Sequence, residues 1–225
     1  MIADPLYIVV TVICLLASRG AGFMLQKRFS EFSQSPVAYT GKQVAERMLH
    51  ENGIDDVEVI SVAGQLTDHY NPATKTVNLS EPVCHQQNVA AAAVAAHECG
   101  HAVQHAKAYA PLTFRSAIVP VVNISSKFMQ WVLLAGVVMA ASGSTTVLWI
   151  GVAMFAVTTL FSIVTLPVEF DASRRALKWL DGSGVVSSAQ QEQAASALKW
   201  AASTYVVAAL ASIGQLLVFL RYLRR

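Results

Sequence analysis

The chain has 225 residues, of which 54% are hydrophobic and 13% are charged, and its formal net charge is +2. This composition is too apolar for an ordinary soluble globule, and the charge is too small and too scattered to predict a nucleic-acid partner. The three cysteines show no spacing typical of a disulfide framework, which favours a reducing compartment for any soluble part.

The first predicted element is a membrane helix within 1–26. The apolar run 5–18 is shorter than the roughly 20 residues that cross a bilayer. It reaches that length only when Arg19 extends its side chain toward the membrane surface and 20–26 continue the helix.

The next segment, 27–115, is polar enough to form a soluble domain. A capping box at Thr40-Gly41-Lys42-Gln43 predicts an amphipathic helix near 41–52. Alternating residues in 57–62 predict a strand. A second strand is predicted at 75–80. It suits the open sheet edge that pairs with an extended substrate, and an ordinary sheet strand is the alternative interpretation.

A longer helix is predicted to begin near Pro82 and to end before Pro111. It carries His97-Glu98-Cys99-Gly100-His101, in which two histidines four residues apart lie on one helical face and can hold one Zn²⁺. Glu98 lies beside that metal without binding it. It is therefore the expected general base, which takes a proton from zinc-bound water.

Two neighbours of the motif are not expected to bind the metal. His105 continues the spacing of His97 and His101, but the three histidines span about 12 Å, too far for one zinc ion with bonds near 2.0 Å. We interpret His105 as a surface or supporting residue. Cys99 points away from the ligand face and is expected to be a small buried side chain.

Two further membrane helices are predicted within 116–168, because 128–168 contains no charged residue and is long enough for two crossings. The break is expected at Ser142-Gly143-Ser144. A soluble segment, 169–199, follows. The uncharged run 200–220 then predicts a fourth crossing within 200–225, which ends in Arg221, Arg224 and Arg225.

A catalytic zinc needs a third protein ligand. We expect this ligand to be Glu169, because it follows the hairpin directly and can turn back toward the histidines. Asp171 is a possible partner that orients a ligand histidine. A solvated acidic pair followed by Arg174 and Arg175 is the alternative interpretation of this segment.

These residues resemble the YugP-type membrane zinc metallopeptidases. The resemblance rests on the HExxH string, on Thr67-Asp68-His69-Tyr70-Asn71-Pro72 and on Leu166-Pro167-Val168-Glu169-Phe170-Asp171-Ala172-Ser173-Arg174-Arg175, and it covers nearly the whole chain. It implies a small bacterial peptidase of the cell (inner) membrane, related in layout to HtpX and the CAAX prenyl proteases, with its metal site at the cytoplasmic face. Those relatives carry a Glu-x-x-x-Asp string, whereas here Ser173 stands four residues after Glu169.

The expected fold is therefore mostly α with a small β-sheet, a four-helix membrane-embedded zincin of the gluzincin-like kind. The expected function is zinc-dependent endopeptidase activity on peptide or protein substrates. The positive-inside rule places 27–115 and 169–199 in the cytoplasm by count of basic residues, against the C-terminal arginines.

Two other functions remain open. Leu180-Asp181-Gly182 imitates the string that supplies an aspartate ligand in site-2-type intramembrane proteases, although its polar surroundings favour a helix-ending turn. A non-catalytic zinc-binding membrane scaffold or adaptor is the second alternative, which the presence of Glu98 disfavours.

Overall fold

The computed structural model describes residues 5–223, which form seven helices and a three-stranded sheet. The start of the predicted 1–26 segment, and Arg224 and Arg225 of the predicted basic cluster, lie outside the described residues. The chain divides into two compact units. One contains the described residues up to Ala21, then Phe114–Leu166 and the described residues from Thr204 on, and the other contains Gly22–Thr113 and Pro167–Ser203.

Four helices are long and apolar enough to cross a membrane within the described part of the chain. They are α1 (Pro5–Phe32), α5 (Ala110–Ala141), α6 (Thr146–Ser183) and α7 (Ser188–Leu223). Each extends beyond the apolar run that predicted it. The predicted hairpin break is present, because α5 ends at Ala141 and Gly143 follows with a φ of 93°.

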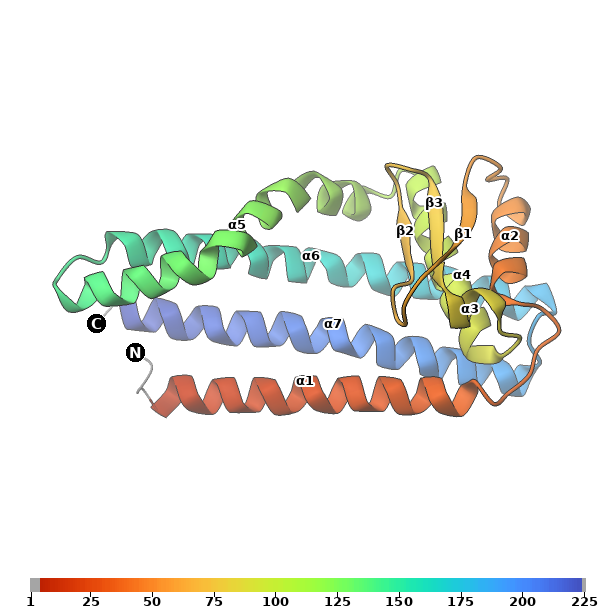
Figure 1. The fold of residues 1–225 in the computed structure, drawn as a ribbon, viewed down its shortest axis with the longest axis horizontal. Helices are drawn as coiled ribbons and strands as arrows, with labels where there is room; N and C mark the ends of the chain where they lie inside the picture. Colours follow the sequence, from red (N-terminus) through yellow and green to blue (C-terminus); the bar gives the residue numbers. More distant parts are fainter. Residues whose placement is uncertain (1–4, 224–225) are drawn as a thin grey trace. The chain divides into compact units, whose positions relative to one another are not determined.

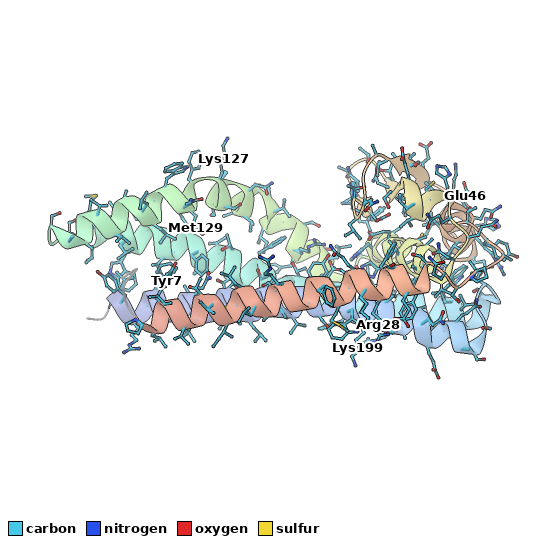
Figure 2. All side chains as sticks on the ribbon, turned by 60° about the horizontal axis from the view of Figure 1, so that its bottom comes forward. Tyr7, Arg28, Glu46, Lys127, Met129 and Lys199 are labelled. Atoms are coloured by element: carbon cyan, nitrogen blue, oxygen red, sulfur yellow. The ribbon has the colours of Figure 1, made fainter. Side chains whose placement is uncertain are left out.

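In the first unit, small residues and aromatic rings bring the helices together. A Cβ on Gly136 would lie 2.5 Å from the Cα atom of Leu148, so α5 and α6 approach closely at this glycine. Phe155 of α6 and Phe219 of α7 meet edge to face, with ring centroids 5.5 Å apart. Many large apolar side chains are exposed on these helices. Lys127 is also exposed and projects outward from α5 (Figure 2). Such an apolar surface is typical of helices that contact lipid.

The second unit contains the sheet, formed by β1 (Glu58–Val62), β2 (His69–Asn71) and β3 (Thr76–Ser80) (Figure 1). The strand order is β1-β3-β2, with β3 parallel to β1 and antiparallel to β2. The expectation that 75–80 forms the open edge is therefore wrong, because β3 lies in the middle. The two edges belong to β1 and β2. Strand β2 has only three residues, too few for a pattern of alternating residues to reveal it.

Three shorter helices also belong to this unit: α2 (Gly41–Glu51), α3 (Glu81–His85) and α4 (Val89–Ala106). The capping box of α2 is confirmed, since Thr40 and Gln43 exchange both hydrogen bonds. The single helix predicted from Pro82 is instead α3 and α4, because Asn88 begins a new helix by accepting a hydrogen bond from the Ala91 amide.

The core of the second unit is built around α4. Its alanines up to Ala102 are almost completely buried, together with apolar residues of α2, β3 and α6. Small side chains let α2 and the sheet approach the backbone of α4 closely. The core therefore holds α4 in place along most of its length, which fixes the position of the HExxH motif.

Candidate metal centre

His97 and His101 lie on the same face of α4, one turn apart, as their spacing requires. Their ring centroids are 4.9 Å apart and the ring planes are nearly perpendicular. His101 is 8% exposed, and the side chain of His97 is 12% exposed. The two imidazoles are thus largely, but not completely, buried.

Glu169 of α6 faces both histidines. Its Oε2 atom lies 3.3 Å from Nε2 of His97 and 3.7 Å from Nε2 of His101. Potential ligand atoms of the three residues all lie within 4.8 Å of one another. A tetrahedral zinc ion with bonds near 2.0 Å places its ligands about 3.3 Å apart, so this donor set fits zinc with small adjustments.

The other nitrogen of each imidazole is held from outside the centre. Ser173 Oγ lies 3.1 Å from Nδ1 of His97, and Gln104 Oε1 lies 3.0 Å from Nδ1 of His101. Both rings therefore present Nε2 toward Glu169. Ligand histidines in zinc sites are held in this way, because a hydrogen bond at one nitrogen fixes the tautomer and the ring orientation.

Gln104 is itself held firmly, with no solvent exposure. Its Nε2 atom donates to the Val168 carbonyl at 2.7 Å and to Asp171 Oδ2 at 2.9 Å. Because both partners only accept, the amide oxygen must face His101, which then carries its proton on Nδ1. Arg175 donates to the same Asp171 oxygen at 2.6 Å. Asp171 thus reaches the histidine through Gln104, not directly.

Charge in the centre favours a bound cation. Burial alone lowers the pKa of His101, but the hydrogen bond to Glu169 and the charges of Glu98 and Glu169 outweigh it and raise this pKa above its ordinary value. Two carboxylates therefore attract positive charge to one buried site.

Glu98 lies beside the two histidines and is 8% exposed. Within the described residues, the structure records no hydrogen-bond partner for its carboxylate. A buried carboxylate next to the candidate ligands that is not engaged elsewhere is free to accept a proton. This is the property that a general base needs.

Gly100, inside the motif, lets α4 approach α6. A Cβ at this position would lie 2.6 Å from the Ala172 carbonyl oxygen, closer than real contacts allow. Since Ala172 lies between Glu169 and Ser173, the glycine sets the distance between the histidines and the residues that face them.

The remaining predicted residues lie elsewhere. His105 is exposed and contacts Tyr70 of β2, whose hydroxyl lies 2.8 Å from its Nδ1 atom. Cys99 is fully buried and points to the Ala45 carbonyl oxygen at 3.5 Å. Asp181 is exposed in the last turns of α6 and is not part of the His97, His101 and Glu169 group.

Sequence reasoning missed Gln104 and gave Ser173 no role. Gln104 follows His101 by three residues and so shares its side of α4, but a glutamine there is also typical of a solvated helix. Ser173 stands at the place that the aspartate takes in the Glu-x-x-x-Asp string described above for HtpX and the CAAX prenyl proteases. That position was the available signal, because it lies one turn after Glu169.

Comparison with known proteins places these features in context. A family model described as "Putative neutral zinc metallopeptidase" matches residues 7–224. The protein named "Putative membrane protease YugP" of Bacillus subtilis is 38% identical over 216 residues, which is 95% of each chain. No solved structure matches.

Proposed function

Because the chain belongs to the zinc metallopeptidase family whose model it matches, we propose that it is an integral membrane zinc-dependent endopeptidase. The observation that carries the proposal is the meeting of His97, His101 and Glu169 in one buried group, with Glu98 beside them. Three protein ligands leave one zinc position for water, the arrangement of catalytic zinc sites.

In this mechanism zinc, when bound, lowers the pKa of a water molecule toward 7 and polarises the substrate carbonyl. Glu98 accepts the proton of the attacking water and passes it to the leaving amine. Gln104 and Ser173 keep Nε2 of each ligand histidine turned toward the metal position. The chain itself therefore supplies the ligands, the base and the groups that orient them.

The substrate is an extended peptide that pairs with the open edge of β2. This strand lies against α4, where Tyr70 meets His105 one turn beyond the ligand His101. Main-chain hydrogen bonds to a strand edge bind a peptide without demanding a particular sequence. An edge strand above the HExxH helix is also the arrangement of a gluzincin-like fold, which we propose for this unit.

We propose that 1–26, 116–168 and 200–225 provide the four membrane crossings and that 27–115 and 169–199 lie in the cytoplasm. The apolar helices and the relative's name support a membrane protein, and the count of basic residues supports this orientation. Cysteines introduced at Gly143 and Ser183 test it. If an impermeant reagent added outside intact cells labels position 183 and not 143, the orientation is reversed.

The competing functions predict different metal behaviour. We expect Ala at His97, His101 or Glu169 to abolish zinc binding, with Asp181→Ala as the matched control that retains it. Zinc loss in Asp181→Ala with full retention in Glu169→Ala would favour a site-2-type centre instead. A wild-type protein that holds one zinc and cleaves no peptide would favour the scaffold.

A further inference from the structure

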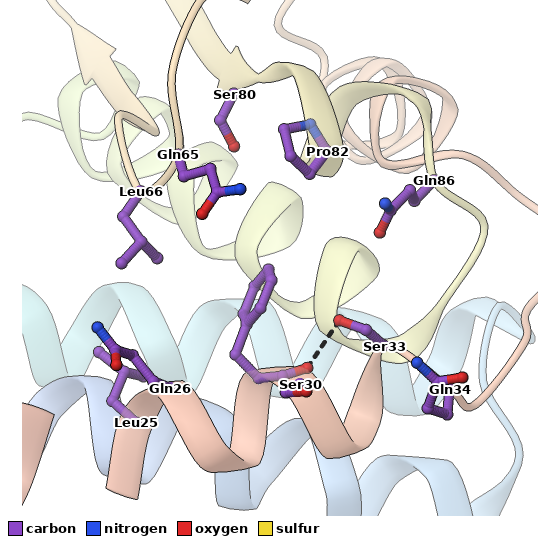
Figure 3. A pocket seen from close by; sticks show the side chains of 11 residues that line it. Leu25, Gln26, Ser30, Ser33, Gln34, Gln65, Leu66, Ser80, Pro82 and Gln86 are labelled. Carbon is purple, nitrogen blue, oxygen red and sulfur yellow. Dashed lines mark hydrogen bonds between the residues drawn. The ribbon is translucent and has the colours of Figure 1, made fainter. Parts of the chain in front are cut away.

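The second unit contains a cavity of about 520 Å³ beside the N-terminal end of α4. Its walls come from the last turns of α1, the loop between β1 and β2, and the residues that lead into and out of α3 (Figure 3). We call it the glutamine pocket, after Gln26, Gln34, Gln65 and Gln86 in its lining.

The lining is uncharged and mixes polar with apolar side chains. Alongside the four glutamines it contains three serines, and Phe29 and Leu66 supply apolar surface. None of the described residues that line the pocket is acidic or basic. Such a wall accepts neutral polar and apolar groups, and it offers no compensation for the desolvation of a charge.

Several of these amides are available to a ligand. Gln86 accepts a hydrogen bond from Asn88, and Ser33 donates to the Phe29 carbonyl oxygen. In contrast, the structure gives the side chains of Gln26 and Gln65 no hydrogen-bond partner among the described residues. A carboxamide both donates and accepts, so it complements the N–H and C=O groups of a peptide backbone.

The pocket and the open edge of β2 lie on the two sides of the metal centre along α4. Tyr70 of β2 contacts His105, C-terminal to the motif. At the other end, the α4 cap Asn88 contacts Gln86 of the pocket. Along α4, His97 and His101 lie between these two contacts.

The axial separation along α4 corresponds to a short length of extended peptide. From Asn88 to His97 is nine residues of α4, or about 13 Å along the helix axis. An extended chain covers about 3.3 Å per residue, so this is roughly four residues. The loop that carries Gln65 and Leu66 also leads directly into β2, and Asp68 ties it to β3 by accepting hydrogen bonds from the amide and hydroxyl of Ser80.

We propose that the glutamine pocket binds the substrate of the proposed peptidase about four residues from the scissile bond and selects uncharged segments there. The inference rests on the proposed function for its substrate. The amides bind the peptide backbone, and Phe29 and Leu66 contact an apolar side chain. The protein then cleaves within extended stretches that carry a neutral residue at this distance.

Peptide binding to the Glu98→Gln protein tests the proposal without cleavage of the probe. The probes are a fluorescein-labelled uncharged peptide that covers only the metal centre, the same peptide extended by about four residues at each end, and an extended form with lysines in the extensions. Gln26→Glu with Gln65→Glu places carboxylates in the pocket. Gln87→Glu, which is exposed and outside the lining, is the matched control.

We expect the double variant to bind the neutral extended peptide about tenfold more weakly than its parent, the Glu98→Gln protein, does. It should bind the lysine form more tightly than that parent does. The short peptide and the Gln87→Glu control should not change. The proposal would be overturned if each probe bound the parent and the double variant with the same affinity. It would also be overturned if the double variant lost the same amount of affinity for the short and the extended peptides. Binding that follows the prediction, with no cleavage by the wild type, would contradict the endopeptidase alone.

Discussion

Gln104 Oε1 and His101 Nδ1 lie 3.0 Å apart in the interior of the second unit. The side-chain NH2 group of Gln104 donates to Val168 and Asp171 of α6. The tautomer of a candidate zinc ligand is thus fixed by a residue that does not touch the metal. We therefore expect zinc affinity to depend on the side chain at position 104.

We expect Gln104→Met to lower zinc affinity by about 10 to 100-fold, because His101 then loses the group that orients it. The Val168 carbonyl and Asp171 would also lose a donor, so the variant should be less stable by roughly 1–3 kcal/mol. Gln104→Glu restores an acceptor for Nδ1 and should recover much of the affinity, although Asp171 then repels it. Competition with a chelator measures the zinc affinity of both variants. Equal zinc affinity in the Met and Glu variants would contradict the orienting role of Gln104.

Gly100→Ala should separate α4 from α6, because the new Cβ would lie 2.6 Å from the Ala172 carbonyl oxygen. Overpacking of this kind costs about 1–3 kcal/mol, and zinc affinity should fall with it. Gly182→Ala is the matched control, since nothing lies within 4 Å of its Cβ position. Thermal melts and zinc titrations should separate the two. If both variants behave alike, the close approach at Gly100 is unimportant.

Cys99 should resist alkylation in the native protein. Burial raises the pKa of its thiol well above the ordinary value of 9.0, and the charge of Glu98 adds to the effect. We expect iodoacetamide at mildly alkaline pH to leave Cys99 unlabelled until the protein is denatured, as read by mass spectrometry of tryptic peptides. Rapid native labelling would show that α4 does not pack against α2 as described.

Much of the candidate site could be predicted from the sequence, because its residues follow local spacing. Two histidines four residues apart share a helical face, and the capping box at Thr40 marks the start of α2. Glu169 lies far from the histidines in sequence, and only its place after an uncharged run suggested it. The structure brings the three together, and their zinc binding stays a prediction.

The parts that the sequence could not give depend on tertiary packing. Strand β2 has three residues, too few for a periodic signal, so the sheet edge was assigned to the wrong strand. The break between α3 and α4 depends on Asn88, one polar residue before an alanine-rich run. Gln104 is recognisable only when its three partners, two of them on α6, are in place around it.

The central claim, that Glu98 is the general base of a zinc peptidase, is tested most directly by Glu98→Gln. The amide fills the same space and the metal ligands are untouched, so zinc content and melting temperature should stay close to those of the wild type. Peptide hydrolysis by the purified protein should fall by about 10² to 10⁴-fold, while His97→Ala should lose zinc and activity together. A Glu98→Gln protein that binds zinc and still cleaves near the wild-type rate would contradict the account.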